Sequence, residues 1–122
     1  MATVKPFRGL RPPPEIAKDL SCLPYDVMSS EEAAAMAEGK VCSLLHITRS
    51  EIDMPRDIDV HSPEVYAKSA ANFALWQEKG WLVQDETPHF YIYAQTMGRR
   101  TQYGIVGCAA VDDYLSGVIK EH

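Results

Sequence analysis

Two short segments near the N-terminus carry the residues whose chemistry is best suited to binding a ligand. Arg8 and Arg11 lie in the sequence PFRGLRP, and Tyr25 and Asp26 follow in LPYDV. Because proline fixes its own φ and disfavours helix in the residue before it, both segments are expected to be extended, ordered loops. A guanidinium binds phosphate or carboxylate through paired hydrogen bonds, and a stiff loop loses little entropy on binding. The pattern predicts an anion site at these four residues.

The spacing of the two arginines sets a geometric condition on this site. Side chains three positions apart on a regular strand point to opposite sides, so both arginines can share one pocket only if the backbone is irregular at Gly9. We expect that irregularity, with at least one guanidinium near Tyr25 and Asp26. A structural interpretation stays open at this stage, in which the arginines pair with acidic neighbours and the Tyr-Asp pair closes a turn.

No second centre of chemistry is evident in the sequence. The histidines are scattered without the i, i+4 spacing of a helical zinc site, so we predict no metal. No glycine loop for phosphate is present, and Gly104 and Gly107 fall inside a strand pattern, where glycine marks a bulge or a close backbone approach. The three cysteines are widely spaced and form no C-x-x-C pair, which predicts free thiols in a reducing compartment.

The composition narrows the class of protein. The chain has 122 residues, of which 46% are hydrophobic and 24% charged, as in ordinary globular proteins. Its net charge of −5 argues against nucleic acid or an anionic membrane as a partner, because both are bound through clusters of lysine and arginine. No apolar run approaches the roughly 20 residues of a membrane span, and the N-terminus has no apolar signal core. We therefore expect a cytoplasmic protein.

Helices are predicted in the first third of the chain. A short helix is expected over 14–20. Ser29 and Glu32 form a capping-box pattern, in which each side chain satisfies backbone at the other residue, and this begins a helix over 31–38. Gly39 supplies the left-handed residue that stops it.

The middle of the chain is predicted to hold a strand, a loop and the longest helix. The compact apolar run at 41–47 indicates a buried strand, and the polar, acidic stretch at 48–61 indicates a surface loop. The long helix begins at Ser62 with Pro63 in its first turn, and Gly80 ends it. Residues recurring at helical spacing predict its buried face, namely Tyr66, Ala70, Phe73 and Trp76.

The remaining elements are predicted to be strands. An entry strand is expected over 4–7, and a β-hairpin over 90–97 and 101–111 that turns at 98–100. Asp112 is expected to cap a last helical turn. The mixed order of elements predicts an α+β fold: a single small domain with a mixed or antiparallel sheet, a hairpin in its C-terminal half and two main helices packed on the sheet.

Five stretches, in order from Pro6 to His122, resemble one known family. They are PFRGLRP, LPYDVMSSEEA, VYAKSAANFALWQEKGWLVQD, HFYIYAQTM and GIVGCAAVDDYLSGVIKEH. Together they resemble the N-terminal region of the bacterial and archaeal family known as domain of unknown function 1015. The resemblance implies cytoplasmic proteins much longer than this chain, without an established activity.

The resemblance also implies where catalysis would reside. In that family a later Asp-Gly-His-His-Arg motif is similar to the nucleotide-handling signature of the ParB and sulfiredoxin superfamily, where a small-molecule kinase activity also occurs. Residues 1–122 would then be the N-terminal domain, with the catalytic motif in the absent C-terminal part. A nucleotide is the cofactor implied for the whole protein, and a small anionic metabolite or nucleotide is the implied partner.

The leading interpretation is therefore the N-terminal domain of a nucleotide- or phosphate-using small-molecule enzyme, inactive on its own. Arg8 and Arg11 would hold the anionic ligand, Tyr25 and Asp26 would shape the same pocket, and His122 would lie near the segment that completes it. The alternative is a structural or protein-interaction module whose two loops dock the absent C-terminal part. Nucleic-acid binding, suggested by the ParB similarity, is disfavoured by the negative charge.

Overall fold

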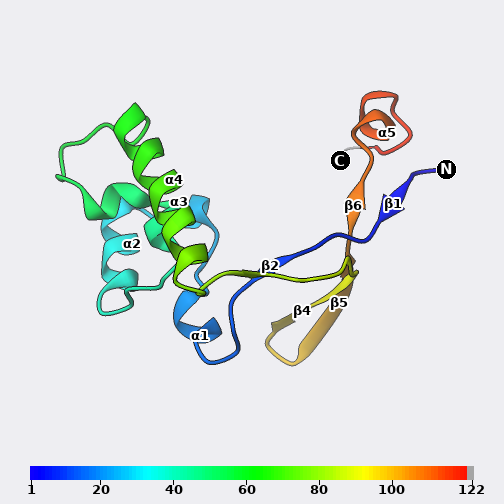
Figure 1. Cartoon of the computed structure of the whole chain (residues 1–122), viewed down its shortest axis with the longest axis horizontal. Coiled ribbons are helices and arrows are strands. Elements are labelled where there is room, and N and C mark those ends of the chain that lie inside the picture. The colour runs from blue at the N-terminus through cyan, green and yellow to red at the C-terminus, as the bar shows by residue number, and fades with distance from the viewer. Residues whose placement is uncertain (121–122) are drawn as a thin grey trace. The chain divides into compact units, whose positions relative to one another are not determined.

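The computed structural model describes residues 1–120 and has the mixed α+β architecture predicted from the sequence (Figure 1). Its helices, with 3-10 helices labelled η, are α1 (Ala17–Leu20), η1 (Tyr25–Val27), α2 (Ser30–Ala37), α3 (Leu45–Thr48), η2 (Ser50–Asp53), α4 (Pro63–Glu78) and α5 (Val111–Leu115). Its strands are β1 (Val4–Lys5), β2 (Leu10–Arg11), β3 (Val83–Gln84), β4 (Tyr91–Met97), β5 (Arg100–Val106) and β6 (Cys108–Ala109). No helix in this described part of the chain has the length and apolar character needed to cross a membrane.

Contacts within the chain divide it into two compact units. Unit 1 consists of Met1–Leu10 and the chain from Gln84 onward, and unit 2 consists of Arg11–Val83. Every buried hydrophobic side chain of the described residues belongs to unit 2, whereas the side chains of unit 1 are largely exposed. The hydrophobic core therefore lies in unit 2.

The core of unit 2 is formed by helices. Ala33 and Ala37 of α2 pack against Leu45 of α3, and three partly buried residues complete the cluster, namely Cys22, Met28 and Ile52. The longest helix, α4, packs against α3 and η2. This core joins helix to helix, whereas the sequence predicted helices packed on a sheet.

Local sequence signals fix the ends of the two longest helices, as predicted. The Ser29 hydroxyl accepts a hydrogen bond from the Glu32 amide (3.2 Å), and the Glu32 carboxylate accepts one from the Ser29 amide (2.8 Å). Gly39 follows α2 with a φ of 73°. Helix α4 begins at Pro63, and Gly80 follows its end with a φ of 71°. Both glycines have the left-handed backbone that terminates a helix at little cost.

The capping box should make α2 sensitive to acid. Hydrogen bonds from the backbone and the hydroxyl of Ser29 hold the pKa of Glu32 below its ordinary value of 4.5. A carboxyl group whose pKa is lowered by folding stabilises the fold above its unfolded pKa, and this contribution is lost as the pH falls through the folded value. We expect Glu32→Gln to lower the melting temperature at pH 7 and to have progressively less effect below about pH 4.5. Thermal melts by circular dichroism measure this.

The matched control for that measurement is Glu31→Gln, in the same first turn of α2. Glu31 makes no capping hydrogen bond among the described residues, so the substitution removes the same charge from a carboxylate that takes no part in the box. An equal and pH-independent effect of the two substitutions would contradict the prediction.

Two predictions for the middle of unit 2 are wrong. The apolar run at 41–47 is not a strand, because the chain turns there and enters α3, where Leu45 is buried. A short apolar run does not separate a buried strand from a buried helix, and this ambiguity explains the error. The stretch at 48–61 is not entirely a surface loop, since Ser50 and Glu51 in η2 are buried.

The buried face of α4 also differs from the predicted one. Its buried side chains are Val65, Asn72 and Trp76. Of the four predicted residues only Trp76 is buried, and the other three are exposed, namely Tyr66, Ala70 and Phe73. Val65 and Asn72 each precede a predicted residue by one position, which corresponds to a rotation of about 100° around the helix, whereas Trp76 belongs to both faces.

Unit 1 contains the predicted hairpin. β4 and β5 pair antiparallel in a register that runs from Tyr91 opposite Val106 to Met97 opposite Arg100. Gly98 in the turn has a φ of 62°, the conformation that a tight hairpin turn requires. The predicted second strand is interrupted after β5, and β6 pairs antiparallel with β1.

Gly107, the residue between β5 and β6, is closely packed. A Cβ on Gly107 would lie 2.9 Å from the Phe90 ring and 3.1 Å from Val4. The predicted close approach of backbone at Gly107 is thus confirmed, whereas Gly104 has open space beside it. The last helix, α5, follows Ala110 as its N-cap, so the predicted capping role of Asp112 is wrong.

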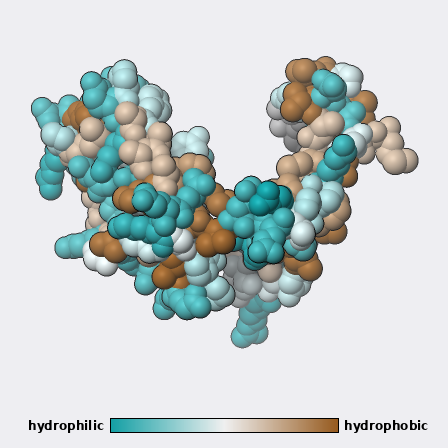
Figure 2. Space-filling view, in the orientation of Figure 1, coloured by the Kyte–Doolittle hydropathy of each residue, from teal (hydrophilic) through white to brown (hydrophobic). Residues whose placement is uncertain are grey.

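The hairpin presents one apolar face to solvent. Ile92 pairs with Ile105 and Ala94 pairs with Tyr103, so these four residues share a face. The isoleucines are 80% and 81% exposed, and Tyr103 is 71% exposed. Hydrophobic residues also gather over α5, in the upper right of Figure 2. The apolar side chains of the hairpin and α5 in unit 1 are thus exposed, whereas the apolar core residues of unit 2 are buried.

Candidate functional site

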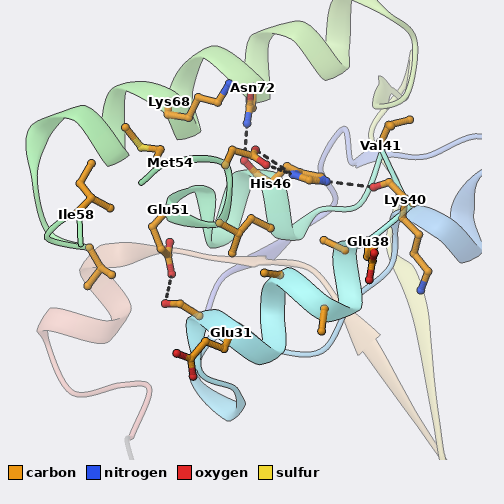
Figure 3. Close-up of a pocket in the computed structure, with 18 of the residues that line it drawn as sticks. Glu31, Glu38, Lys40, Val41, His46, Glu51, Met54, Ile58, Lys68 and Asn72 are labelled. Atoms are coloured by element: carbon orange, nitrogen blue, oxygen red, sulfur yellow. Dashed lines mark hydrogen bonds and ion pairs between the residues drawn. The ribbon is translucent and has the colours of Figure 1, made fainter. Parts of the chain in front are cut away.

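The most prominent cavity of the described residues lies wholly within unit 2. It is an open groove of about 1160 Å³. Its walls are α2 on one side and α4 on the other, with His46 between them (Figure 3). The turn at Lys40, η2 and the segment 54–60 complete the lining. Ligand pockets usually measure about 300–1,000 Å³, so the groove has room for a molecule of nucleotide size or larger.

His46 is held at the floor of the groove by both ring nitrogens. Nδ1 lies 2.9 Å from each carboxylate oxygen of Asp53, and Nε2 lies 3.2 Å from the carbonyl oxygen of Lys40. The backbone carbonyl of His46 accepts a hydrogen bond of 2.6 Å from the Asn72 side chain. Both ring partners are acceptors, so both are satisfied only when each nitrogen carries a proton.

This arrangement assigns His46 a positioning role. The imidazole joins α3 to η2 and to the turn at Lys40, while Asn72 fixes α3 to α4. In this geometry neither ring nitrogen is left to accept a proton from a ligand, although an Asp-His pair is a familiar feature of catalytic sites. The hydrogen bonds of the pair therefore shape the groove.

Arg49 forms a second network behind the wall of the groove. Its Nη1 donates to the carbonyl of Tyr25 (2.9 Å), and its Nη2 donates to the hydroxyl of Ser30 (2.9 Å). Its Nε lies 2.7 Å from a carboxylate oxygen of Glu51, as an ion pair without hydrogen-bond geometry. The Ser30 hydroxyl donates in turn to Glu51 (2.9 Å). One guanidinium thus connects η1, α2 and η2.

The remaining lining combines aromatic surface with positive charge. Trp76 and Trp81 contact each other edge to face, with ring centroids 5.0 Å apart, and the Lys79 ammonium lies 4.5 Å from the centre of the Trp81 ring. Lys40, Arg56 and Lys68 also line the groove, and none of them has an ion-pair partner among residues 1–120. Two lining carboxylates likewise have no cationic partner in this part of the chain, namely Glu31 and Glu38.

The predicted anion-site residues are distributed over the two units. Tyr25 and Asp26 form η1 in unit 2 and are exposed, and the carbonyl of Tyr25 binds Arg49. Arg11 is the last residue of β2, at the start of unit 2, whereas Arg8 belongs to unit 1. His122 lies outside the described residues. The proximity of Arg8 to Tyr25 and Asp26 therefore stays a prediction.

The PFRG segment (residues 6–9) forms hydrogen bonds with Asp85 and Tyr91 of unit 1. The sequence did not indicate these two residues as its partners. Arg8 Nε donates to the backbone carbonyl of Asp85 (2.7 Å), and the Gly9 amide donates to the hydroxyl of Tyr91 (2.7 Å). That hydroxyl donates to the Asp85 carboxylate and lies 3.2 Å from the carbonyl oxygen of Phe7. The strand pattern is interrupted at Arg8 and Gly9, so the expected irregularity is present.

Glycine is required at position 9 for a reason other than the predicted positive φ. Its φ is not positive. A Cβ at this position would instead lie 2.6 Å from the hydroxyl oxygen of Tyr91 and 2.7 Å from the ring carbon that bears it. The glycine is needed because the Tyr91 side chain occupies the space beside its Cα.

Sequence reasoning missed the two residues that organise the groove, His46 and Arg49. Both lie with Glu51 and Asp53 in an eight-residue stretch in which two basic side chains are followed by two acidic ones. That grouping of opposite charges was the available signal, but it is equally typical of a solvated loop. Only the burial of Glu51 distinguishes the two cases.

Comparison with known families matches residues 4–122 to the family described as "Protein of unknown function (DUF1015)". Comparison with curated proteins and with solved structures gives no match. The family resemblance inferred from the sequence is therefore confirmed, and it brings no activity with it. The more distant similarity to the ParB and sulfiredoxin superfamily stays a prediction.

Proposed function

The chain belongs to this family of unknown function, and from that premise we propose that unit 2 binds a small organic anion, of the nucleotide or phosphorylated-metabolite class, in the groove between α2 and α4. The groove would be the ligand-binding part of a nucleotide- or phosphate-using protein. The proposal includes the cytoplasmic location expected from the sequence, where such molecules are made and used.

The charge of the groove carries this proposal. Four cationic side chains line the groove, namely Lys40, Arg56, Lys68 and Lys79. Two carboxylates without a cationic partner also line it, Glu31 and Glu38. The two carboxylates of η2 have partners within the protein, since Glu51 forms an ion pair with Arg49 and Asp53 forms a hydrogen bond with His46. An excess of positive charge beside apolar surface favours a ligand with an apolar body and an anionic group.

Binding, and not catalysis, is what the groove supports. His46 is the lining residue best suited to proton transfer, and both of its nitrogens are already engaged. The proposal therefore assigns no reaction to these residues, in keeping with the expectation that the chain is inactive by itself.

Titration calorimetry with ADP, AMP and inorganic phosphate tests the proposal. We expect at least one probe to bind, with an affinity that falls as salt is added, because exposed charges are screened. The double substitution Lys40→Ala and Lys68→Ala should weaken binding by roughly tenfold or more through the loss of two nearby charges. The control is Lys18→Ala, an exposed lysine in α1 that does not line the groove. Absence of binding, or equal binding by the double variant, would contradict the proposal.

Arg8 is a second candidate for the residue that binds the anion. Its Nε is anchored on the carbonyl of Asp85, which orients the guanidinium, and its two terminal nitrogens have no hydrogen-bond partner among residues 1–120. The same titrations with Arg8→Gln separate the candidates. Loss of binding in Arg8→Gln, with no change in the double lysine variant, would move the site to the PFRG segment.

The alternative function is a structural or protein-interaction module. It is favoured by the apolar face of the hairpin, where Ile92, Tyr103 and Ile105 are exposed. Contiguous exposed apolar surface commonly marks a contact with another polypeptide. If no anion binds in the titrations above, this interpretation replaces the first.

A further inference from the structure

Arg49 has an electrostatic role at the groove without lining it. Its guanidinium lies behind the wall, and Glu51, its ion-pair partner at 2.7 Å, faces the groove. The side chains are 18% and 8% exposed, so solvent screens neither charge effectively. Ser30 donates to the carboxylate from the α2 side, which holds Glu51 in place.

Resting on the ligand site proposed above, we infer that Arg49 determines the charge class of the ligand by neutralising Glu51. With the pair intact, the floor of the groove contributes no net charge at this point, and the surrounding lysines and Arg56 attract anions. Without the guanidinium, the same carboxylate would be an unpaired and nearly buried negative charge beside the ligand. Such a charge repels an anion and attracts a cation, and low exposure strengthens both effects.

The arginine is suited to this role in a way that a lysine or histidine is not. A guanidinium keeps its charge throughout the physiological pH range, and its planar fork serves several acceptors at once. Arg49 uses that fork on Tyr25, Ser30 and Glu51 together. The carbonyl of Tyr25 thereby fixes the direction of the guanidinium, so the charge stays beside Glu51.

A pair of matched probes tests the inference, naphthalene-1-sulfonate as the anion and 1-naphthylmethylammonium as the cation. Binding is followed by calorimetry and by the NMR shift of the Trp76 indole N–H, which reports on the groove. Wild-type protein should prefer the sulfonate. Glu51→Gln, which keeps the hydrogen bond from Ser30, should raise sulfonate affinity roughly fivefold or more and lower ammonium affinity. Arg49→Met should have the opposite effect on both probes.

The double variant, Arg49→Met with Glu51→Gln, separates charge from structure. Because it restores the charge balance, it should return the preference to that of wild type, which a merely structural role of Arg49 would not do. Lys18→Met, outside the groove, is the control for a change in total charge. If Arg49→Met fails to fold, Glu51→Gln still decides the question by its direction.

The outcomes distinguish this inference from the proposed function. If wild-type protein binds neither naphthalene-1-sulfonate nor the nucleotides and phosphate tested above, the proposed function fails and the inference fails with it. Suppose instead that the sulfonate binds, and that Glu51→Gln and Arg49→Met prefer it over the ammonium as strongly as the wild-type protein does. The proposed function then stands and the inference is overturned.

Discussion

Trp76→Ala is expected to lower the free energy of unfolding by about 3–5 kcal/mol, the usual cost of truncating a buried aromatic residue. The Trp76 side chain is 5% exposed, its indole N–H donates to the carbonyl of Cys42 (3.0 Å), and its ring contacts Trp81. Truncation removes apolar contact, opens a cavity and leaves a buried carbonyl without its donor, and each of these effects is destabilising. Urea denaturation followed by circular dichroism measures the loss.

Phe73→Ala in the same helix is the matched control for that experiment. Phe73 is 44% exposed, so its truncation removes little buried surface and should cost less than about 1 kcal/mol. The sequence pattern placed Phe73 on the buried face of the helix, where truncation would cost more, and its exposed side chain reverses that expectation. Equal losses for the two substitutions would show that α4 buries a wider face than Val65, Asn72 and Trp76.

Gly9→Ala is expected to disrupt the PFRG segment of unit 1. The added Cβ would lie 2.6 Å from the hydroxyl oxygen of Tyr91, which is closer than real Cβ contacts allow. Tyr91 cannot withdraw without breaking its hydrogen bonds with the Gly9 amide and the Asp85 carboxylate. Overpacking of this kind costs about 1–3 kcal/mol, and the broken hydrogen bonds add to it.

Hydrogen exchange of two amides measures this effect locally. Phe7 and His89 bond to each other through both of their backbone amides, at 3.0 and 2.9 Å, so they report whether the segment is in place. Their exchange should accelerate roughly tenfold or more, since each 1.4 kcal/mol of lost stability is a factor of ten. Gly104→Ala, where a Cβ would meet nothing within 4 Å, should leave both rates unchanged. Unchanged exchange in Gly9→Ala would mean that Tyr91 moves aside freely.

The PFRG segment also illustrates how a correct expectation arose from the wrong cause. Proline and glycine together predicted an irregular backbone at Gly9, and the strand is interrupted there. The expected cause was positive φ, which is a property of the residue itself. The actual cause is contact with Tyr91, 82 positions away in the sequence. Local sequence contains no information about that partner.

The sequence by itself determined the features that depend on neighbouring residues. Ser29 and Glu32 begin α2 because each satisfies the backbone of the other, and Gly39 and Gly80 follow their helices because glycine adopts positive φ without strain. Gly98 closes the hairpin for the same reason. These interactions span a few positions, so residue identity alone decides them.

Only the tertiary structure decided which surfaces are buried and which charges meet. The buried stripe of α4 includes Asn72, whose side chain is satisfied by the carbonyl of His46, so hydrophobicity pointed to the neighbouring stripe instead. Arg49 and Glu51 look like residues of a solvated loop until α2 and η1 enclose them. A polar side chain is compatible with burial or with exposure, and the difference lies in partners that are distant in sequence.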